Sequence, residues 1–190
     1  MTKSVKIGYV FRLAIIFTAV CCLISFASLM SGALTDGDFL DEETMTSFQT
    51  ATTFYNFTLV GTIVCIVLSC VAQSFCMKLS VVARTVLIGL ETVLLFVGFK
   101  VNSVLSFSAK LIKKVGEIDD YTDEELAELM NVSEDKIEEI VEFLETDPKI
   151  EPFLVALLFG VAVFGILSFT SIHWLVKKKT EKMTYEQAFN

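Results

Sequence analysis

The sequence predicts an all-α membrane protein with four transmembrane helices and a small acidic two-helix extracytoplasmic module between the third and the fourth. Three observations predict this fold class. The mean hydropathy is +0.65 and 54% of the residues are hydrophobic, which is typical of a chain that resides in a membrane. The apolar residues gather in four runs, each close to the length of about 20 residues that a helix needs to cross a bilayer. Fifteen of the 23 acidic residues lie together, between Glu117 and Glu151.

The four apolar runs are residues 13–34, 57–77, 85–107 and 153–176. The third contains Glu91 and Lys100 and is therefore interrupted by charge. The first run has an alternative interpretation as a cleaved signal peptide, because small residues at 31–33 resemble a cleavage site. Its apolar core is longer than the roughly 7–15 residues of a signal peptide, which favours a retained transmembrane helix.

Basic residues near the ends of the runs predict the orientation, because lysine and arginine concentrate on the cytoplasmic side of a membrane. Residues 35–56 contain neither. The N-terminus, the turn after the second run and the C-terminal tail are basic, with Lys3, Lys6, Arg12, Lys78, Arg84, Lys177, Lys178, Lys179 and Lys182. Both termini are therefore predicted to be cytoplasmic, in a protein of the cell membrane. Lys110, Lys113 and Lys114 lie on the predicted external side, against the rule.

These runs and flanks divide the chain into six segments. The predicted division is the N-terminus and first span (1–34), an external loop (35–56), the second and third spans with a short cytoplasmic turn (57–112), an acidic external module (113–151), the fourth span (152–176) and a basic cytoplasmic tail (177–190).

The acidic segment is predicted to fold into two helices. Residues 117–151 hold fifteen acidic residues and two lysines, a formal net charge of −13, whereas the rest of the chain carries +5. Thr122 and Glu125 have the spacing of a capping box, which predicts a helix over Asp123–Met130. Ser133 is placed to cap a second helix, whose apolar residues recur at helical spacing: Ile137, Ile140, Val141 and Leu144. So small a core needs support from the membrane helices or from a partner.

The charge of this helix pair excludes nucleic acid as a partner, although its spacing is similar to that of a helix-turn-helix. Contacts to phosphates need lysine and arginine, and the second helix begins instead with a run of carboxylates. These carboxylates form the candidate interaction surface, which consists of Glu134, Asp135, Glu138, Glu139 and Glu142.

A candidate intramembrane polar site lies on the third run. Charged groups inside a bilayer are costly, which makes Glu91 a functional candidate. Helical spacing places it on one face with Arg84, Gly98, Asn102 and Ser106. The candidate site is Glu91, Arg84, Arg12 and Asn102. Two hypotheses stay open: an ion pair with Arg84 or Arg12, or a hydrogen bond, that fixes the packing of the helices, and a proton or cation site.

Small residues at four-residue spacing predict close contacts between the helices. They are Gly61, Cys65, Ser69 and Gln73 in the second run, and Ala156, Gly160 and Ser168 in the fourth. All five cysteines lie within the predicted spans, which excludes a disulfide framework in the external segments. Lys100, half a turn out of phase with Glu91, is predicted to extend its amine to the membrane surface.

The sequence gives poor support for an enzyme, and no cofactor or metal is expected. His173 is the single histidine, and there is no glycine-rich phosphate loop. The layout of four spans resembles the outline of tetraspanins and claudins. The acidic segment has no cysteine, and hence lacks the Cys-Cys-Gly motif of the tetraspanins, so the chain is assigned to no family.

Two classes of function remain. The first is a non-enzymatic multi-pass membrane protein that presents the acidic module for protein interaction or self-association. Its expected partners, besides membrane lipid, are a basic protein patch, a polyamine or loosely bound cations. The alternative is a small transporter or channel subunit that uses Glu91 as a proton or cation site.

Overall fold

The computed structural model describes residues 3–34, 42–76, 79–116, 118, 121–145 and 150–188. Throughout these residues the regular structure is helical, and no strand occurs in them, so the all-α fold class is confirmed. The seven helices are α1 (Lys3–Leu34), α2 (Glu42–Cys76), α3 (Leu79–Val97), α4 (Phe99–Val115), α5 (Asp123–Met130), α6 (Glu134–Glu145) and α7 (Glu151–Ala188).

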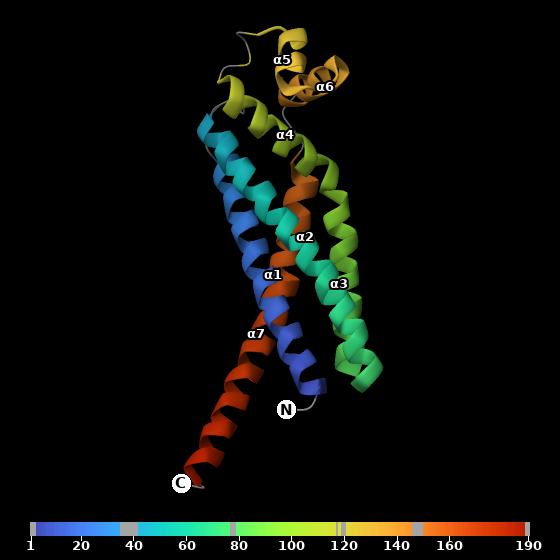
Figure 1. Ribbon diagram of the computed structural model, residues 1–190, viewed down its shortest axis with the longest axis vertical. Helices are drawn as coiled ribbons and strands as arrows, with labels where there is room; N and C mark the ends of the chain where they lie inside the picture. The colour runs from blue at the N-terminus through green and yellow to red at the C-terminus, as the bar shows by residue number, and fades with distance from the viewer. Residues whose placement is uncertain are drawn as a thin grey trace.

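Four of these helices are long and apolar enough to cross a membrane, as the sequence predicts. The candidate spans are Lys6–Ala33, Glu42–Ala72, Ser80–Val97 and Glu151–Lys179. In the bundle α1 packs against α2 and α7, and α3 packs against the same two helices. Figure 1 shows the start of α1 and the end of α7 at one end of the molecule, and α5 with α6 at the other. The last part of α7 extends beyond the bundle.

The helix that contains the second predicted span begins much earlier than the predicted boundary at residue 57. α2 starts at Glu42, so most of the segment predicted to be the first external loop is helical. The cause is a row of buried residues at helical spacing, Met45, Phe48, Ala51 and Tyr55. Threonines separate these residues and lower the local hydropathy, which hid the helix from a search for apolar runs.

The third predicted span, residues 85–107, is not one helix. α3 ends at Val97, the chain turns at Gly98, and α4 begins at Phe99 and crosses the end of the bundle (Figure 1). A side chain at Gly98 would meet Phe153 of α7 at 3.2 Å and the hydroxyl of Tyr55 at 3.2 Å. The glycine therefore allows α2 and α7 to pack against the junction. Beyond it, α4 is amphipathic, with buried Leu105 and Ile112 on one face and exposed lysines elsewhere.

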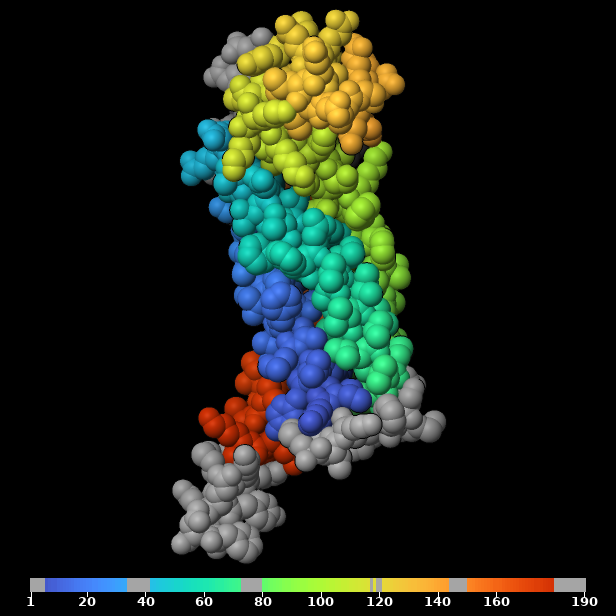
Figure 2. Space-filling model, viewed as in Figure 1, coloured from blue at the N-terminus to red at the C-terminus, as the bar shows by residue number. Residues whose placement is uncertain are grey.

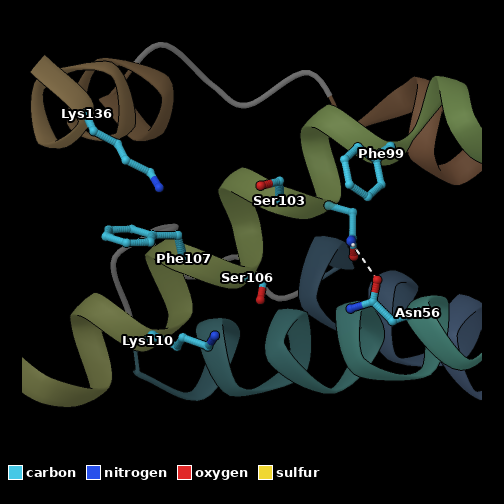
Figure 3. A pocket seen from close by; sticks show the side chains of 8 residues that line it. Asn56, Phe99, Ser103, Ser106, Phe107, Lys110 and Lys136 are labelled. Atoms are coloured by element: carbon cyan, nitrogen blue, oxygen red, sulfur yellow. Dashed lines mark hydrogen bonds between the residues drawn. The ribbon is translucent and has the colours of Figure 1, made fainter. Parts of the chain in front are cut away.

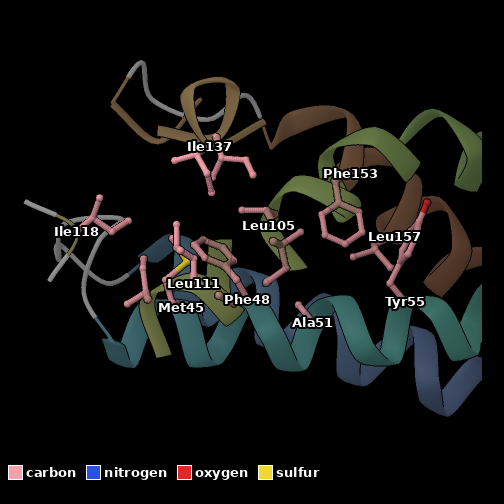
Figure 4. Packing of buried hydrophobic residues seen from close by; sticks show 14 of the residues in the cluster. Met45, Phe48, Ala51, Tyr55, Leu105, Leu111, Ile118, Ile137, Phe153 and Leu157 are labelled. Carbon is pink, nitrogen blue, oxygen red and sulfur yellow. The ribbon is translucent and has the colours of Figure 1, made fainter. Parts of the chain in front are cut away.

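The helix pair α5–α6 shares one hydrophobic core with the bundle. The predicted bounds of α5 and the predicted start of α6 after Ser133 are confirmed. Ile137 of α6 belongs to the same buried cluster as Leu111 of α4, Phe48 of α2 and Leu157 of α7 (Figure 4). Figure 2 shows α5 and α6 lying directly over α4, at the end of the bundle. The support that so small a pair requires therefore comes from the membrane helices.

The small residues singled out in the sequence lie at helix contacts. Cys65 Sγ is 3.8 Å from Thr18 Oγ1 of α1, and Gly61 faces the same threonine. The hydroxyls of Ser69 and Thr85 are hydrogen-bonded to each other, which joins α2 to α3. The fourth-span residues Ala156, Gly160 and Ser168 are also buried. The side chain of Gln73 lies outside the described residues.

Replacement of Gly61 by alanine is expected to loosen the contact between α1 and α2. The added Cβ would lie 3.2 Å from Thr18 Cβ and Cγ2, which forces one of the helices to shift. Overpacking of this kind costs about 1–3 kcal/mol, and it should lower the melting midpoint of the protein in lipid nanodiscs. Gly89→Ala is the control, because a Cβ there meets nothing within 4 Å. Equal midpoints for the two variants would contradict the proposed contact.

Candidate functional site

Glu91 lies in the middle of the bundle, on the face of α3 that also carries Ile88 and Leu95. All three side chains have an exposed fraction of 0%. Gly160 of α7 makes room for the carboxyl group, because a Cβ at that position would lie 2.8 Å from Cys22 Sγ and closer still to Glu91 Oε1. Neither carboxyl oxygen of Glu91 has a hydrogen-bond partner among the described residues. The three helices α1, α3 and α7 thus enclose an unpaired acidic group.

The two arginines expected near Glu91 lie elsewhere. The guanidinium carbon of Arg12 is 3.9 Å from the ring centroid of Trp174, which makes a cation–π contact between α1 and α7. Tyr9 packs edge-on against the same indole at 5.1 Å. Arg84 is half-buried and precedes Glu91 by seven residues, or about 10 Å along the helix axis. No ion pair of Glu91 is found within the described part of the chain.

Asn102, the fourth residue of the predicted intramembrane site, belongs to a different cluster. It lies on α4, beyond the turn at Gly98, and has an exposed fraction of 3%. Its Nδ2 donates to Oδ1 of Asn56 on α2 at 3.2 Å, whereas its Oδ1 is buried without a partner in the described structure. The predicted polar stripe on the third span is therefore divided into two separate places by the helix break.

Asn102 and Asn56 line an open pocket of about 280 Å³ between α2, α4 and α6 (Figure 3). Ser103 and Ser106 complete its uncharged polar lining, and two phenylalanines, 99 and 107, supply the apolar part. Lys110 of α4 and Lys136 of α6 add two amines. The pocket could not be predicted from the sequence, because its lining comes from three helices. The polar side of α4 was the available signal, but α4 was predicted to lie partly within the membrane.

The carboxylates of the candidate interaction surface lie on α6 and are exposed. This holds for all five residues, Glu134, Asp135, Glu138, Glu139 and Glu142. Glu139 Oε1 lies 3.4 Å from Lys100 Nζ, with side-chain exposed fractions of 60% and 82%. So exposed a pair contributes about 0–1 kcal/mol. Lys100 thus lies just after the end of the candidate span at Val97 and pairs with α6, rather than standing alone at the membrane surface.

The lysines that violated the positive-inside pattern belong to α4. Lys110, Lys113 and Lys114 lie on its exposed side. Lys114 Nζ donates to the backbone oxygen of Leu129 at the end of α5. The basic helix α4 lies beneath the acidic pair α5–α6, so the opposite charges of the two attract each other. The contact with α5 thus accounts for Lys114 at this end of the bundle.

The capping box predicted at Thr122 and Glu125 is confirmed. The backbone N–H of Thr122 donates to Glu125 Oε2 at 2.9 Å, and Glu125 N donates to Thr122 Oγ1 at 3.4 Å. The backbone hydrogen bond, followed by one from the Thr122 hydroxyl, holds the pKa of Glu125 below its usual value. At the other end of α5, Asn131 adopts a left-handed conformation with φ of 53° and ends the helix.

The described residues include no group of three or more histidine, cysteine or acidic side chains arranged to hold a metal ion. Cys21, Cys22 and Cys65 are free thiols within the candidate spans, and Cys70 lies in the second of these spans. Comparison with protein-family models, curated proteins and solved structures finds no match to this chain.

Thr122→Ala is expected to raise the titration midpoint of Glu125, because the variant removes one hydrogen bond to the ionised carboxyl. The pKa of Glu125 is lower in the folded protein than in the unfolded chain. The hydrogen bonds to its ionised carboxyl therefore stabilise α5 above the ordinary carboxyl pKa range, and this stabilisation is lost as the pH falls through the pKa of Glu125 in the folded protein. The variant should therefore destabilise α5 at neutral pH and less so in acid. Carbon NMR of the Glu125 carboxyl would measure the midpoint. Thr53→Ala, which removes an exposed hydroxyl on α2, is the control; an unchanged Glu125 midpoint in Thr122→Ala would refute the coupling.

Proposed function

We propose that this chain is a non-enzymatic multi-pass membrane protein that presents an acidic helical surface to a protein partner or to a second copy of itself. The observation that carries the proposal is the way in which α5 and α6 are held. Their apolar residues, among them Leu126 and Ile137, are buried in the core that they share with α4, whereas their carboxylates face outwards. The exposed carboxylates are therefore carried by a helix pair that is packed against the rest of the bundle.

A fixed acidic surface favours a basic partner. The formal charge of residues 117–151 is −13, and complementary charge accelerates association and suppresses partners of like charge. The natural counterpart is a protein patch rich in lysine and arginine. A polyamine or loosely held cations would be attracted to the same surface and would compete with a protein partner.

The proposed orientation places this surface outside the cell, with both termini in the cytoplasm. Three exposed lysines of α7, Lys177, Lys178 and Lys179, lie toward the end of the bundle that is opposite to α5 and α6. Their position supports the orientation through the positive-inside rule, while the contacts of Lys100 and Lys114 account for two basic residues at the acidic end.

Neutralisation of three carboxylates on α6 is expected to weaken a salt-sensitive interaction. Glu134, Asp135 and Glu138 are exposed and make no ion pair in the described structure, so Glu134→Gln, Asp135→Asn and Glu138→Gln can be combined. The combined variant should recover roughly tenfold less partner from native membranes at about 0.1 M salt, and wild-type recovery should fall as salt rises. Quantitative mass spectrometry of the co-purified proteins measures both effects.

The control for this experiment removes the same charge from other places. Glu42→Gln, Glu43→Gln and Glu151→Gln change exposed carboxylates at the starts of α2 and α7. The control should recover partners at the wild-type level. Equal recovery by all three proteins, or equal loss in both variants, would rule out α6 as the contact surface.

A second function, transport of protons or cations, is favoured by the state of Glu91. A buried carboxyl without a hydrogen-bond partner is costly and rare, and such groups in membrane helices often belong to proton or ion pathways. Glu91 lies near the middle of the candidate span Ser80–Val97, where a group that exchanges a proton between the two sides would be placed.

The transport function predicts that Glu91→Gln abolishes ion flux without unfolding the protein, because glutamine keeps the shape of the side chain and removes its acidity. The measurement is proton uptake into vesicles that contain the purified protein, driven by an imposed membrane potential. Glu151→Gln, an exposed change at the start of the fourth candidate span, should transport at the wild-type rate. Equal flux in Glu91→Gln and wild type would eliminate this function and leave the interaction proposal intact.

A further inference from the structure

The pocket between α2, α4 and α6 differs in charge from the acidic surface beside it (Figure 3). None of the residues that line it carries a carboxylate, whereas two of them, Lys110 and Lys136, carry an amine. Lys136 is one of only two basic residues in the segment 117–151. Its amine lies 4.8 Å from the ring centroid of Phe107, a contact that leaves its N–H donors available. The pocket is thus a basic recess next to an acidic face.

The pocket lies at the depth of a lipid headgroup. The third candidate span ends at Val97, and all the α4 residues of the pocket follow it. On α2, Asn56 lies near the middle of the candidate span Glu42–Ala72, about 24 Å from Ala72. This span is about 46 Å long, which exceeds a hydrocarbon core of about 30 Å, so part of it extends beyond the core. A core that ends near Val97 on α3 leaves the pocket at the boundary between lipid tails and headgroups. Phe99, which is half-exposed, borders the pocket with apolar surface.

Two kinds of hydrogen-bonding group in this pocket are available to a ligand, the amines of two lysines and the amide oxygen of Asn102. Lys110 and Lys136 form no ion pair in the described residues, in contrast to Lys100, which is paired with Glu139. The oxygen Oδ1 of Asn102 is a buried acceptor without a partner, since the amide nitrogen already bonds to Asn56. A matching ligand must therefore offer anionic acceptors to the amines and a hydroxyl donor to Asn102.

We propose that the pocket binds a phosphate ester of a polyol, the chemistry of an acidic phospholipid headgroup such as phosphatidylglycerol. The phosphate lies between the amines of Lys110 and Lys136, and a hydroxyl of the polyol donates to Asn102 Oδ1. Basic pockets between membrane helices are suited to such headgroups, and the positive charge of two amines favours an anionic headgroup over a zwitterionic one. A soluble glycerol phosphate has the same chemistry and is the other source of the ligand.

The test is a titration of the detergent-solubilised full chain with phosphatidylglycerol, phosphatidylcholine and glycerol 1-phosphate, followed by native mass spectrometry. Wild type should bind phosphatidylglycerol at least about tenfold more tightly than phosphatidylcholine. The double variant Lys110→Gln with Lys136→Gln should lose roughly tenfold or more of this affinity, because it removes two charge-assisted hydrogen bonds. Displacement of the lipid by glycerol 1-phosphate identifies the soluble source, and its failure to displace the lipid identifies the membrane source.

A matched control separates the pocket from general attraction to basic residues. Lys113→Gln with Lys179→Gln removes the same charge from exposed lysines outside the pocket and should keep the wild-type affinity within about twofold. Ser106→Leu leaves every charge in place but fills the pocket, and it should also abolish the preference for phosphatidylglycerol. The proposal is overturned if wild type shows no preference, if both lysine double variants lose affinity equally, or if Ser106→Leu binds like wild type.

Discussion

The close approach of three helices at Gly98 is the constraint on which the outer half of the molecule depends. Tyr55 of α2 donates from its hydroxyl to the backbone oxygen of Leu95, one of the carbonyls left without a helical partner where α3 ends. Its ring packs edge-on against Phe153 of α7, with 4.6 Å between centroids. Because the glycine has no side chain, α2 and α7 close on the junction, and α4 leaves the bundle axis to form the platform for α5 and α6.

Polar side chains are accommodated in the bundle mostly through their own helix. Thr18, Thr62 and Ser171 each donate a hydroxyl hydrogen to the carbonyl four residues earlier, at 2.7–2.8 Å. A hydroxyl that is satisfied in this way can be buried in lipid or between helices without a partner on another helix. Glu91 makes no such bond, and its carboxyl group lies against Gly160 of α7. Among the described residues, Asn102 Oδ1 and Ser168 Oγ are also buried without a hydrogen-bond partner, and Glu91 is the one of these three residues that carries an acidic group.

Features that depend on neighbouring residues in the chain could be predicted from the sequence. The four apolar helices, the capping box of Thr122 with Glu125 and the start of α6 after Ser133 are of this kind. The break at Gly98 could not be predicted, because it depends on Tyr55 and on α7, which are distant in sequence. The pairing of Arg12 with Trp174 rather than with Glu91, and the pocket around Asn102, likewise arise from contacts between separate helices.

The two connections between the acidic pair and the membrane helices differ mechanically. On one side the chain enters through α4, which meets α3 at the turn of Gly98. On the other side it leaves through α7, a single unbroken helix of 38 residues that is about 57 Å long and passes beyond the far end of the bundle. The first connection thus contains a break between two helices, whereas the second is one continuous helix. Because α7 is continuous, a tilt of its first turns, which pack against Gly98 through Phe153, is carried along the helix to the part that extends beyond the bundle.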